Sequence, residues 1–264
     1  MKIPFQQVDA FADRPFTGNP AAVMPLEAWL DDATLQSIAA ENNLAETAFI
    51  VPWLSDDADF ELRWFTPTVE VALCGHATLA TGHALLSARE TADRVRFATR
   101  QAGVLEVARA GDGYRLTLPA WQVEPKPLPE LSAALGGTPR ETHWRAGGYA
   151  LFLFENAAEV RALSPDFRAM RAFGDILFIA TAPGTDTDIV SRVFAPGAGI
   201  DEDPVTGSAH CILASFWANS LGRDSFTAYQ ASERGGRLDC VLDGDRVVLG
   251  GSCITVIEGV FILA

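Results

Sequence analysis

The residues best suited to chemistry in this 264-residue chain stand in two short segments, one in each half. In the first half, Glu46 lies between a helix-like segment and an apolar strand-like run. A carboxyl group in such surroundings suits a general base or acid, although a partly exposed acid at a helix–strand junction is the alternative. His76 follows Gly75 at an expected helix start, where it would hold a ligand, relay a proton or serve as a polar residue of the first turn.

The second segment, residues 201–210 (DEDPVTGSAH), places Asp203 shortly before Ser208 at another expected helix start. Asp203 is suited to orienting His76 or to moving a proton, and Ser208 to donating a hydrogen bond to a substrate carboxylate. The structural alternatives are an ordinary Asp-Pro turn and an ordinary serine at a helix start.

Gly75 and Gly207 each stand where a strand-like run gives way to a helix-like run. Glycine allows a ligand to approach the backbone closely, and the free N–H groups and dipole of a helix start attract an anion. Two such starts facing one cleft would bind a carboxylate-bearing substrate, with Cys74 and Thr206, the residues before the glycines, lining the same cleft.

Three other chemistries find little support in the sequence. Ser208 lacks the G-x-S-x-G elbow of a hydrolase. Cys74 and His76, with His83 at helical spacing, match no common zinc pattern, so we expect no metal site. The chain contains no G-x-G-x-x-G motif and no P-loop, so we expect no nucleotide cofactor.

Strand-like and helix-like runs alternate along the chain, which predicts an α+β fold. A cluster of prolines at residues 119–129 is the best candidate for a linker. The elements expected in the first half are strands at 46–52 and 60–65, a helix at 76–88, and a hairpin of 104–107 with 114–118.

The chain also contains an internal repeat. An acidic residue begins ETAFIV at Glu46 and DILFIA at Asp175, and an arginine follows both acids at the same spacing, as Arg63 and Arg192. The glycine of the expected helix start, Gly75 or Gly207, then follows each arginine at a similar spacing, with only a short insertion in the second copy. A repeat of this length predicts two similar domains with a cleft between them.

Composition narrows the range of partners. The chain carries 20 Lys+Arg against 34 Asp+Glu, a net charge of −14, which argues against binding to nucleic acids or to anionic membrane surfaces. It shows no secretory leader and no apolar run of the roughly 20 residues that would span a bilayer, so we expect a cytoplasmic protein. We expect its four cysteines, which have no CxxC spacing, to be free thiols.

Six segments spread over essentially the whole chain share the motifs of one family. They are residues 8–11 (VDAF), 15–20 (PFTGNP), 43–49 (NLAETAF), 63–67 (RWFTP), 73–78 (LCGHAT) and 202–209 (EDPVTGSA). Together they resemble the PhzF family of phenazine-biosynthesis-like isomerases. Residues 230–236 (QASERGG) also resemble a substrate-binding segment of that family.

The resemblance implies the diaminopimelate-epimerase-like fold, in which two similar domains each wrap a β-sheet or barrel around a central α-helix. With the internal repeat and the proline cluster, this predicts domains at residues 1–122 and 123–264, with terminal strands able to cross between them. The resemblance also implies a homodimer, a site between the domains, and proton transfer without a metal or an organic cofactor.

By motif match, the proton-transferring glutamate of the family is Glu46. The assisting residues are His76, Asp203 and Ser208, and Asn19 of the Gly-Asn-Pro motif would line the cleft. The reaction implied is a proton shift between two carbons of a small carboxylate-bearing metabolite.

Two rival functions stay open at this point. Related racemases and epimerases use one cysteine before each glycine, whereas this chain has Cys74 before Gly75 but Thr206 before Gly207. Because a threonine hydroxyl is a far weaker acid than a thiol, an inversion by two thiols is disfavoured, but an epimerase that depends on Cys74 remains an alternative. The other rival is a non-catalytic protein of the same fold that binds small carboxylates.

Overall fold

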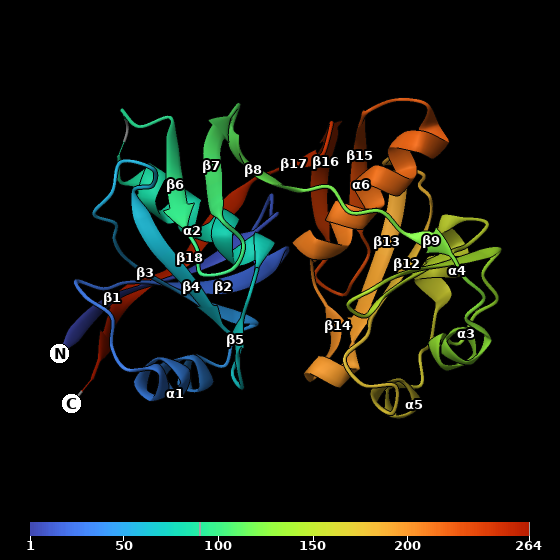
Figure 1. The fold of residues 1–264 in the computed structure, drawn as a ribbon, viewed down its shortest axis with the longest axis horizontal. Coiled ribbons are helices and arrows are strands. Elements are labelled where there is room, and N and C mark those ends of the chain that lie inside the picture. Colours follow the sequence, from blue (N-terminus) through green and yellow to red (C-terminus); the bar gives the residue numbers. More distant parts are fainter. Residues whose placement is uncertain (90, 264) are drawn as a thin grey trace. The chain divides into compact units, whose positions relative to one another are not determined.

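A computed structural model describes residues 1–89 and 91–263 and confirms the α+β class. The chain divides into two compact units, drawn in Figure 1. Unit 1 consists of Met1–Leu118 and Leu249–Ala264, and unit 2 consists of Pro119–Val248.

Unit 1 is a mixed sheet with the long helix α2 (Gly75–Ser87) packed on it and a second helix, α1 (Asp32–Asn42), at its end. Its strand pairs run antiparallel for β1–β2, parallel for β2–β3, antiparallel for β3–β4, parallel for β4–β6 and antiparallel for β6–β7 and β7–β8. The last strand of the chain, β18, returns to pair antiparallel with β1. The elements are β1 (Lys2–Ala10), β2 (Asn19–Pro25), α1 (Asp32–Asn42), β3 (Glu46–Pro52), β4 (Phe60–Phe65), β5 (Glu70–Val71), α2 (Gly75–Ser87), β6 (Arg94–Ala98), β7 (Val104–Ala110), β8 (Gly113–Pro119) and β18 (Cys253–Ile262).

Unit 2 repeats this order of pairings. It runs antiparallel for β10–β11, parallel for β11–β12, antiparallel for β12–β13, parallel for β13–β15 and antiparallel for β15–β16. Its elements are β9 (Glu124–Pro125), α3 (Pro129–Leu135), β10 (Glu141–Arg145), β11 (Tyr149–Leu153), α4 (Ala157–Ala162), α5 (Phe167–Arg171), β12 (Leu177–Pro183), β13 (Ile189–Ala195), the 3₁₀ turn η1 (Pro196–Ala198), β14 (Ile200–Asp203), α6 (Gly207–Leu221), β15 (Ser225–Gln230), β16 (Gly236–Asp243) and β17 (Arg246–Gly251), which runs past the end of the unit.

The strands and the helix expected in the first half are present as β3, β4, α2 and the β7–β8 hairpin. The proline cluster at 119–129 is more ordered than a simple linker. It contains β9, which pairs antiparallel with β10, and its last proline begins α3. Proline fits there because the first position of a helix needs no N–H donor.

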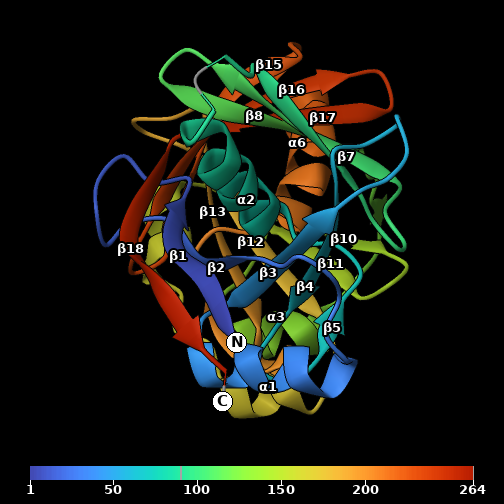
Figure 2. The same ribbon diagram turned by 90° about the vertical axis from the view of Figure 1, so that its left-hand side faces the viewer.

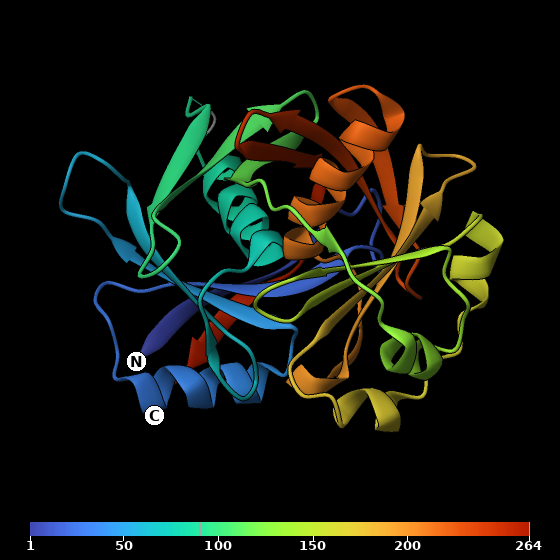
Figure 3. The same cartoon turned by 45° about the vertical axis from the view of Figure 1, so that its right-hand side comes forward.

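Each unit holds one helix that is buried along most of its length. In unit 1, α2 contacts β1, β2, β3, β6, β7 and β18, and Figure 2 shows it lying among these strands. In unit 2, α6, the orange helix of Figure 3, packs against β16 and is buried over most of Gly207–Ala218. A helix buried on all sides must be apolar or small-sided all round, and α2 meets this demand with alanine, glycine, threonine and leucine.

An arginine occupies the same place in both units, buried in unit 1 and partly buried in unit 2. Arg63 on β4 donates two hydrogen bonds to Glu70 at 2.8 and 2.7 Å and a third to Asp32 at 2.8 Å. Arg192 on β13 donates two to Glu202 at 2.7 and 2.9 Å. Paired N–H···O bonds of this kind fix geometry as well as adding stability, so each arginine holds the strand that follows it, β5 or β14, ahead of the buried helix.

In the part of the chain that the structure describes, no helix combines the length and the apolar character needed to cross a membrane.

Gly82 determines how closely α2 approaches β7. A methyl group at Gly82 would lie 2.3 Å from Cγ1 and 2.6 Å from Cβ of Val107. Alanine normally favours a helix interior by about 1 kcal/mol, but overpacking a core costs about 1–3 kcal/mol. We therefore expect Gly82→Ala to lower the free energy of unfolding, as measured by chemical denaturation.

The matched test is the double variant Gly82→Ala/Val107→Ala, which removes the colliding side chain. Its loss of stability should be smaller than the sum of the two single losses, because the two sites share one contact. Strict additivity, or a gain of stability in Gly82→Ala alone, would contradict this packing.

Candidate active site

Glu46 is the first residue of β3, and its place follows from how α1 ends. Asn43 adopts a left-handed conformation with φ of 49° and its N–H bonds the carbonyl of Ala39, which terminates the helix. Asparagine tolerates this conformation better than most residues. The chain then enters β3 with Glu46 beside Ala21 of β2 in the parallel register.

Asn19 is the first residue of β2. Because β2 and β3 are parallel neighbours, Asn19 lies at the same end of the strands as Glu46, the first residue of β3. The preceding Gly18 has φ of +69°, and a Cβ there would lie 2.2 Å from the carbonyl oxygen of Ala10. Only glycine fits this turn without displacing the backbone. The Gly-Asn-Pro motif is therefore a turn that delivers the Asn19 side chain into the interior, where its exposure is zero.

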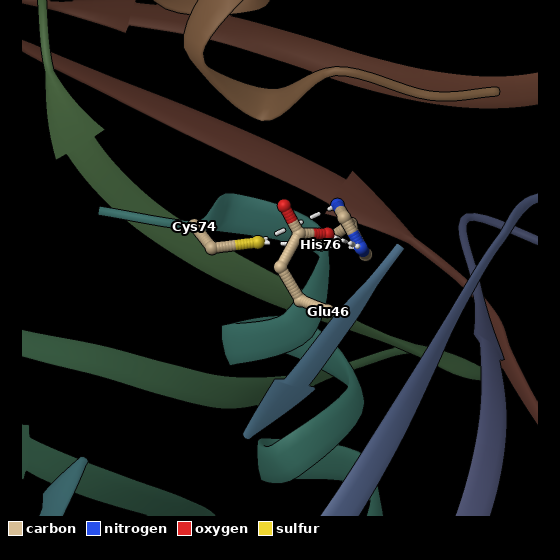
Figure 4. Close-up of side chains that lie close together, drawn as sticks. All are labelled: Glu46, Cys74 and His76. Carbon is tan, nitrogen blue, oxygen red and sulfur yellow. Dashed lines mark hydrogen bonds and ion pairs between the residues drawn. The ribbon is translucent and has the colours of Figure 1, made fainter. Parts of the chain in front are cut away.

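His76 lies between these two strand starts, in the first turn of α2. Its Nε2 is 2.9 Å from Oε2 of Glu46, and its Nδ1 is 3.1 Å from Nδ2 of Asn19. The Sγ of Cys74, the residue before the helix, is 3.6 Å from the same Nδ1. Figure 4 shows the Glu46 and Cys74 side chains converging on the imidazole ring.

Burial and the neighbouring groups set the protonation of this cluster. Burial by itself lowers the pKa of His76, but the contacts with Cys74 and Glu46 outweigh it and raise that pKa well above 6.5. Burial, followed by the charge of Glu46, raises the pKa of the Cys74 thiol to about 11. The contact with Glu46 thus favours the protonated form of the His76 ring, and the raised pKa of Cys74 favours its protonated thiol.

The raised pKa of His76 determines how the free energy of unfolding depends on pH. Because the folded-state pKa of His76 lies above its unfolded value, His76 takes up a proton on folding. The stability it contributes is fully present below about pH 6.5 and is lost as the pH rises through the folded-state pKa.

Unit 2 gathers a second set of polar groups at the start of α6. The hydroxyl of Thr206 donates to Oδ2 of Asp203, and the backbone N–H of Thr206 donates to Oε1 of Gln230 at 2.9 Å. The amide of Gln230 donates in turn to the carbonyl of Asp203 at 2.7 Å. All three residues are buried, and Gln230 lies in the segment that the sequence resemblance had associated with substrate binding.

Ser208, the second residue of α6, lies near the phenol of Tyr149, the first residue of β11. Burial raises the pKa of this phenol. The sequence motifs did not single out Tyr149, but the repeat contained the signal. Gly148–Tyr149 precedes Asp175 at nearly the same spacing at which Gly18–Asn19 precedes Glu46.

The expected residues thus fall into two groups, one in each unit. Glu46, His76, Cys74 and Asn19 come together in unit 1 at the first turn of α2, which begins at Gly75. Asp203 and Thr206 come together in unit 2, where Gly207 and Ser208 begin α6. That the two groups share one cleft stays a prediction.

Comparison with known proteins identifies the chain. A family model described as phenazine biosynthesis-like protein, PhzC-PhzF, matches residues 8–259. The chain belongs to this family. It is 48% identical over 98% of both chains to an uncharacterized isomerase of Pseudomonas aeruginosa. A PhzF family protein of Enterococcus faecalis, whose crystal structure is known, is 42% identical, with a TM-score of 0.91 over all of both chains.

This PhzF family member is an isomerase, as its family and its named relatives indicate. A more distant structure, a hydroxyproline epimerase from Agrobacterium vitis, matches with a TM-score of 0.65 at 13% identity over 98% of this chain and 92% of its own. That likeness shows the epimerase-like fold and confirms the architecture that the sequence resemblance implied.

The pKa values of the imidazole rings of His76 and His210 should lie on opposite sides of the ordinary histidine value of 6.5. His210 on α6 is fully buried with Nδ1 2.8 Å from the carbonyl of Thr206, and burial lowers its pKa to about 4. We expect ¹⁵N spectra of the ring nitrogens to show His76 protonated at a pH at which His210 is neutral. His76→Asn and His210→Asn assign the signals.

Glu46→Gln removes the carboxylate beside His76 and should lower the pKa of that imidazole. Glu41→Gln makes the same change at an exposed position on α1 and should leave it unaltered. A wild-type His76 that titrates at or below 6.5 would contradict the paired geometry.

Proposed function

We propose that this isomerase shifts a proton between two carbons of a small carboxylate-bearing metabolite, with Glu46 as its single acid and base. The observation that carries the proposal is the 2.9 Å contact between Glu46 and His76. The side chains are only 12% and 4% exposed, so a carboxylate and an imidazolium are held together almost out of water.

The proposed reaction begins with Glu46 as a carboxylate. One oxygen of Glu46 faces the His76 ring and the other points away from it (Figure 4), so the second oxygen would take the C–H proton of the substrate. The neutral acid then returns this proton to another carbon. Because few water molecules reach the pair, the proton would stay with the enzyme between the two steps.

The other residues would bind and orient the substrate. We propose that the backbone N–H groups at Gly75 and Gly207, together with the Ser208 hydroxyl, hold its carboxylate. Asp203 would assist the proton transfer through His76. Asn19, Cys74 and Thr206 would line the site and fix the groups that act.

Two features of the site favour Glu46 over an epimerase that depends on Cys74. The pKa of Cys74 is raised to about 11, so its thiol is protonated at neutral pH and is a poor base. The Thr206 hydroxyl, which stands where such epimerases have a second cysteine, is engaged with Asp203 and Gln230. A pair of thiols acting on opposite faces of a substrate therefore has no counterpart in these residues.

Isotope exchange tests the proposal. Purified enzyme incubated in deuterated water with candidate carboxylates should transfer deuterium to carbon, as followed by NMR and mass spectrometry. In Glu46→Gln we expect the exchange rate to fall at least about 100-fold, the contribution of a general base. Glu41→Gln, the same change at the surface, is the control.

The two rivals give different results in the same assay. An epimerase that depends on Cys74 loses exchange in Cys74→Ala and keeps it in Glu46→Gln, the reverse of our expectation. A non-catalytic binding protein shows saturable binding of a carboxylate by calorimetry and no exchange on that ligand.

We also propose that the domains 1–122 and 123–264 are the two copies of the family's repeat, with the terminal strand β18 crossing to pair with β1 of the first copy. We propose further that the enzyme is cytoplasmic and that it is a homodimer. The support for the dimer is the outer face of the β1–β18 pair. Val260 and Ile262 are 56% and 72% exposed, and Pro4 lies opposite Val260 in the register. An exposed apolar strand face of this kind is typical of a surface that pairs with another chain.

Light scattering after size exclusion should give twice the chain mass of 28.3 kDa at micromolar concentration. We expect Val260→Glu to shift the mass toward one chain, because a buried unpaired carboxylate opposes association. Val241→Glu, at an exposed valine of unit 2, should not. A wild-type protein of one chain mass would contradict the dimer.

A further inference from the structure

We propose that Glu46, Cys74 and His76 also form a binding site for a thiophilic divalent cation, Zn²⁺ above all, and that the bound ion inhibits the isomerase. The inhibitory part rests on the proposed function, since it requires Glu46 to be the base. The binding part rests only on the three side chains.

The geometry of the three donors fits one ion. A carboxylate oxygen, an imidazole nitrogen and the thiol sulfur all lie within 4.8 Å of one another, and all three residues are buried. The Sγ of Cys74 is 4.0 Å and the Oε2 of Glu46 is 2.9 Å from Nε2 of His76. Donors around a tetrahedral zinc lie roughly 3.3–3.6 Å apart, given bonds of about 2.0–2.3 Å. The Sγ of Cys74 is nearer to Nδ1 of the ring, at 3.6 Å, than to Nε2, so closing the site requires the thiol to rotate toward the Nε2 side of the ring.

The environment of the ring also suits a metal ligand. With an ion on Nε2, the other ring nitrogen of His76 should carry a proton and donate it to a second residue. The side-chain amide of Asn19, 3.1 Å from Nδ1, occupies that place. An amide turned to present its oxygen would accept this proton.

The donor types decide which ion binds. A sulfur, a nitrogen and one carboxylate oxygen favour Zn²⁺ or Co²⁺ and disfavour Mg²⁺ and Ca²⁺, which prefer oxygen ligands. On binding, the Cys74 thiol and the His76–Glu46 pair each release a proton to solvent. Three protein ligands leave a fourth position for water, as in open zinc sites.

The spacing of the three donors along the sequence did not predict this metal site. Cys74 and His76 alone match no zinc pattern, and for that reason we expected no metal. The third donor, Glu46, comes from β3, a separate element well before Cys74 in the chain. Only the parallel pairing of β2 with β3 and the packing of α2 against both strands bring the carboxylate to the other two donors.

Co²⁺ provides a direct readout, because a thiolate ligand gives a near-ultraviolet charge-transfer band and a tetrahedral site gives intense visible bands. Titration of the metal-free enzyme at mildly alkaline pH should produce both bands at one Co²⁺ per chain, and Zn²⁺ should abolish them. Mg²⁺ should neither produce nor prevent them.

Matched variants assign the ligands. Cys74→Ser should lose the charge-transfer band, and Glu46→Gln and His76→Asn should each weaken binding at least about 10- to 100-fold. Cys253→Ser removes another thiol of unit 1 and should keep both bands. Circular dichroism of each variant checks that it folds. No binding at one ion per chain, or a charge-transfer band that survives in folded Cys74→Ser, would overturn the site.

A separate assay keeps this inference apart from the proposed function. Zn²⁺ should suppress deuterium exchange by the wild type, and a chelator should restore it. Exchange that is unaffected by saturating Zn²⁺ would overturn inhibition while leaving Glu46 as the base. If the Co²⁺ bands appear but Glu46→Gln still exchanges deuterium, the metal site stands and the proposed base is wrong.

Discussion

The contact between Glu46 and His76 is the interaction on which the candidate site depends. A buried carboxylate is unfavourable unless a partner compensates its charge, and a buried imidazolium is unfavourable for the same reason. Each therefore needs the other at close range, and the 2.9 Å separation provides this. The pair forms only where the start of β3 lies against the first turn of α2. The fold of unit 1 brings these two segments into contact.

Both units solve the same packing problem in the same way. A helix of small and apolar residues is buried against a mixed sheet, and an arginine with a paired carboxylate fixes the strand that precedes the helix. The correspondence extends to the site. Asn19 at the start of β2 contacts His76, and Tyr149 at the start of β11 contacts Ser208, each partner being the second residue of its helix. The two units therefore share one arrangement of strands and helix, but the side chain beside the helix start is Asn19 in unit 1 and Tyr149 in unit 2.

The two helix starts differ in what they can do chemically. Unit 1 offers a carboxylate, an imidazole and a thiol, all of which exchange protons. Unit 2 offers hydroxyls and an amide around Asp203, groups that mainly hold hydrogen bonds. This asymmetry suits a reaction with one base better than a symmetric inversion by two. It also explains why the donor set with the character of a metal site lies in unit 1 alone among the described residues.

The sequence by itself determined the α+β class, the strands at β3 and β4 and the helix α2, whereas the grouping of Glu46 with His76 was implied by the family resemblance. Local patterns carry these features, because residue periodicity, turn residues and motif spacing are properties of neighbouring residues. Only the tertiary structure decided that Asn19 bonds the His76 ring, that Tyr149 lies near Ser208, and that Glu46 completes a three-donor set with Cys74. These contacts depend on strand register and on the seating of a buried helix, which bring together residues far apart in the chain.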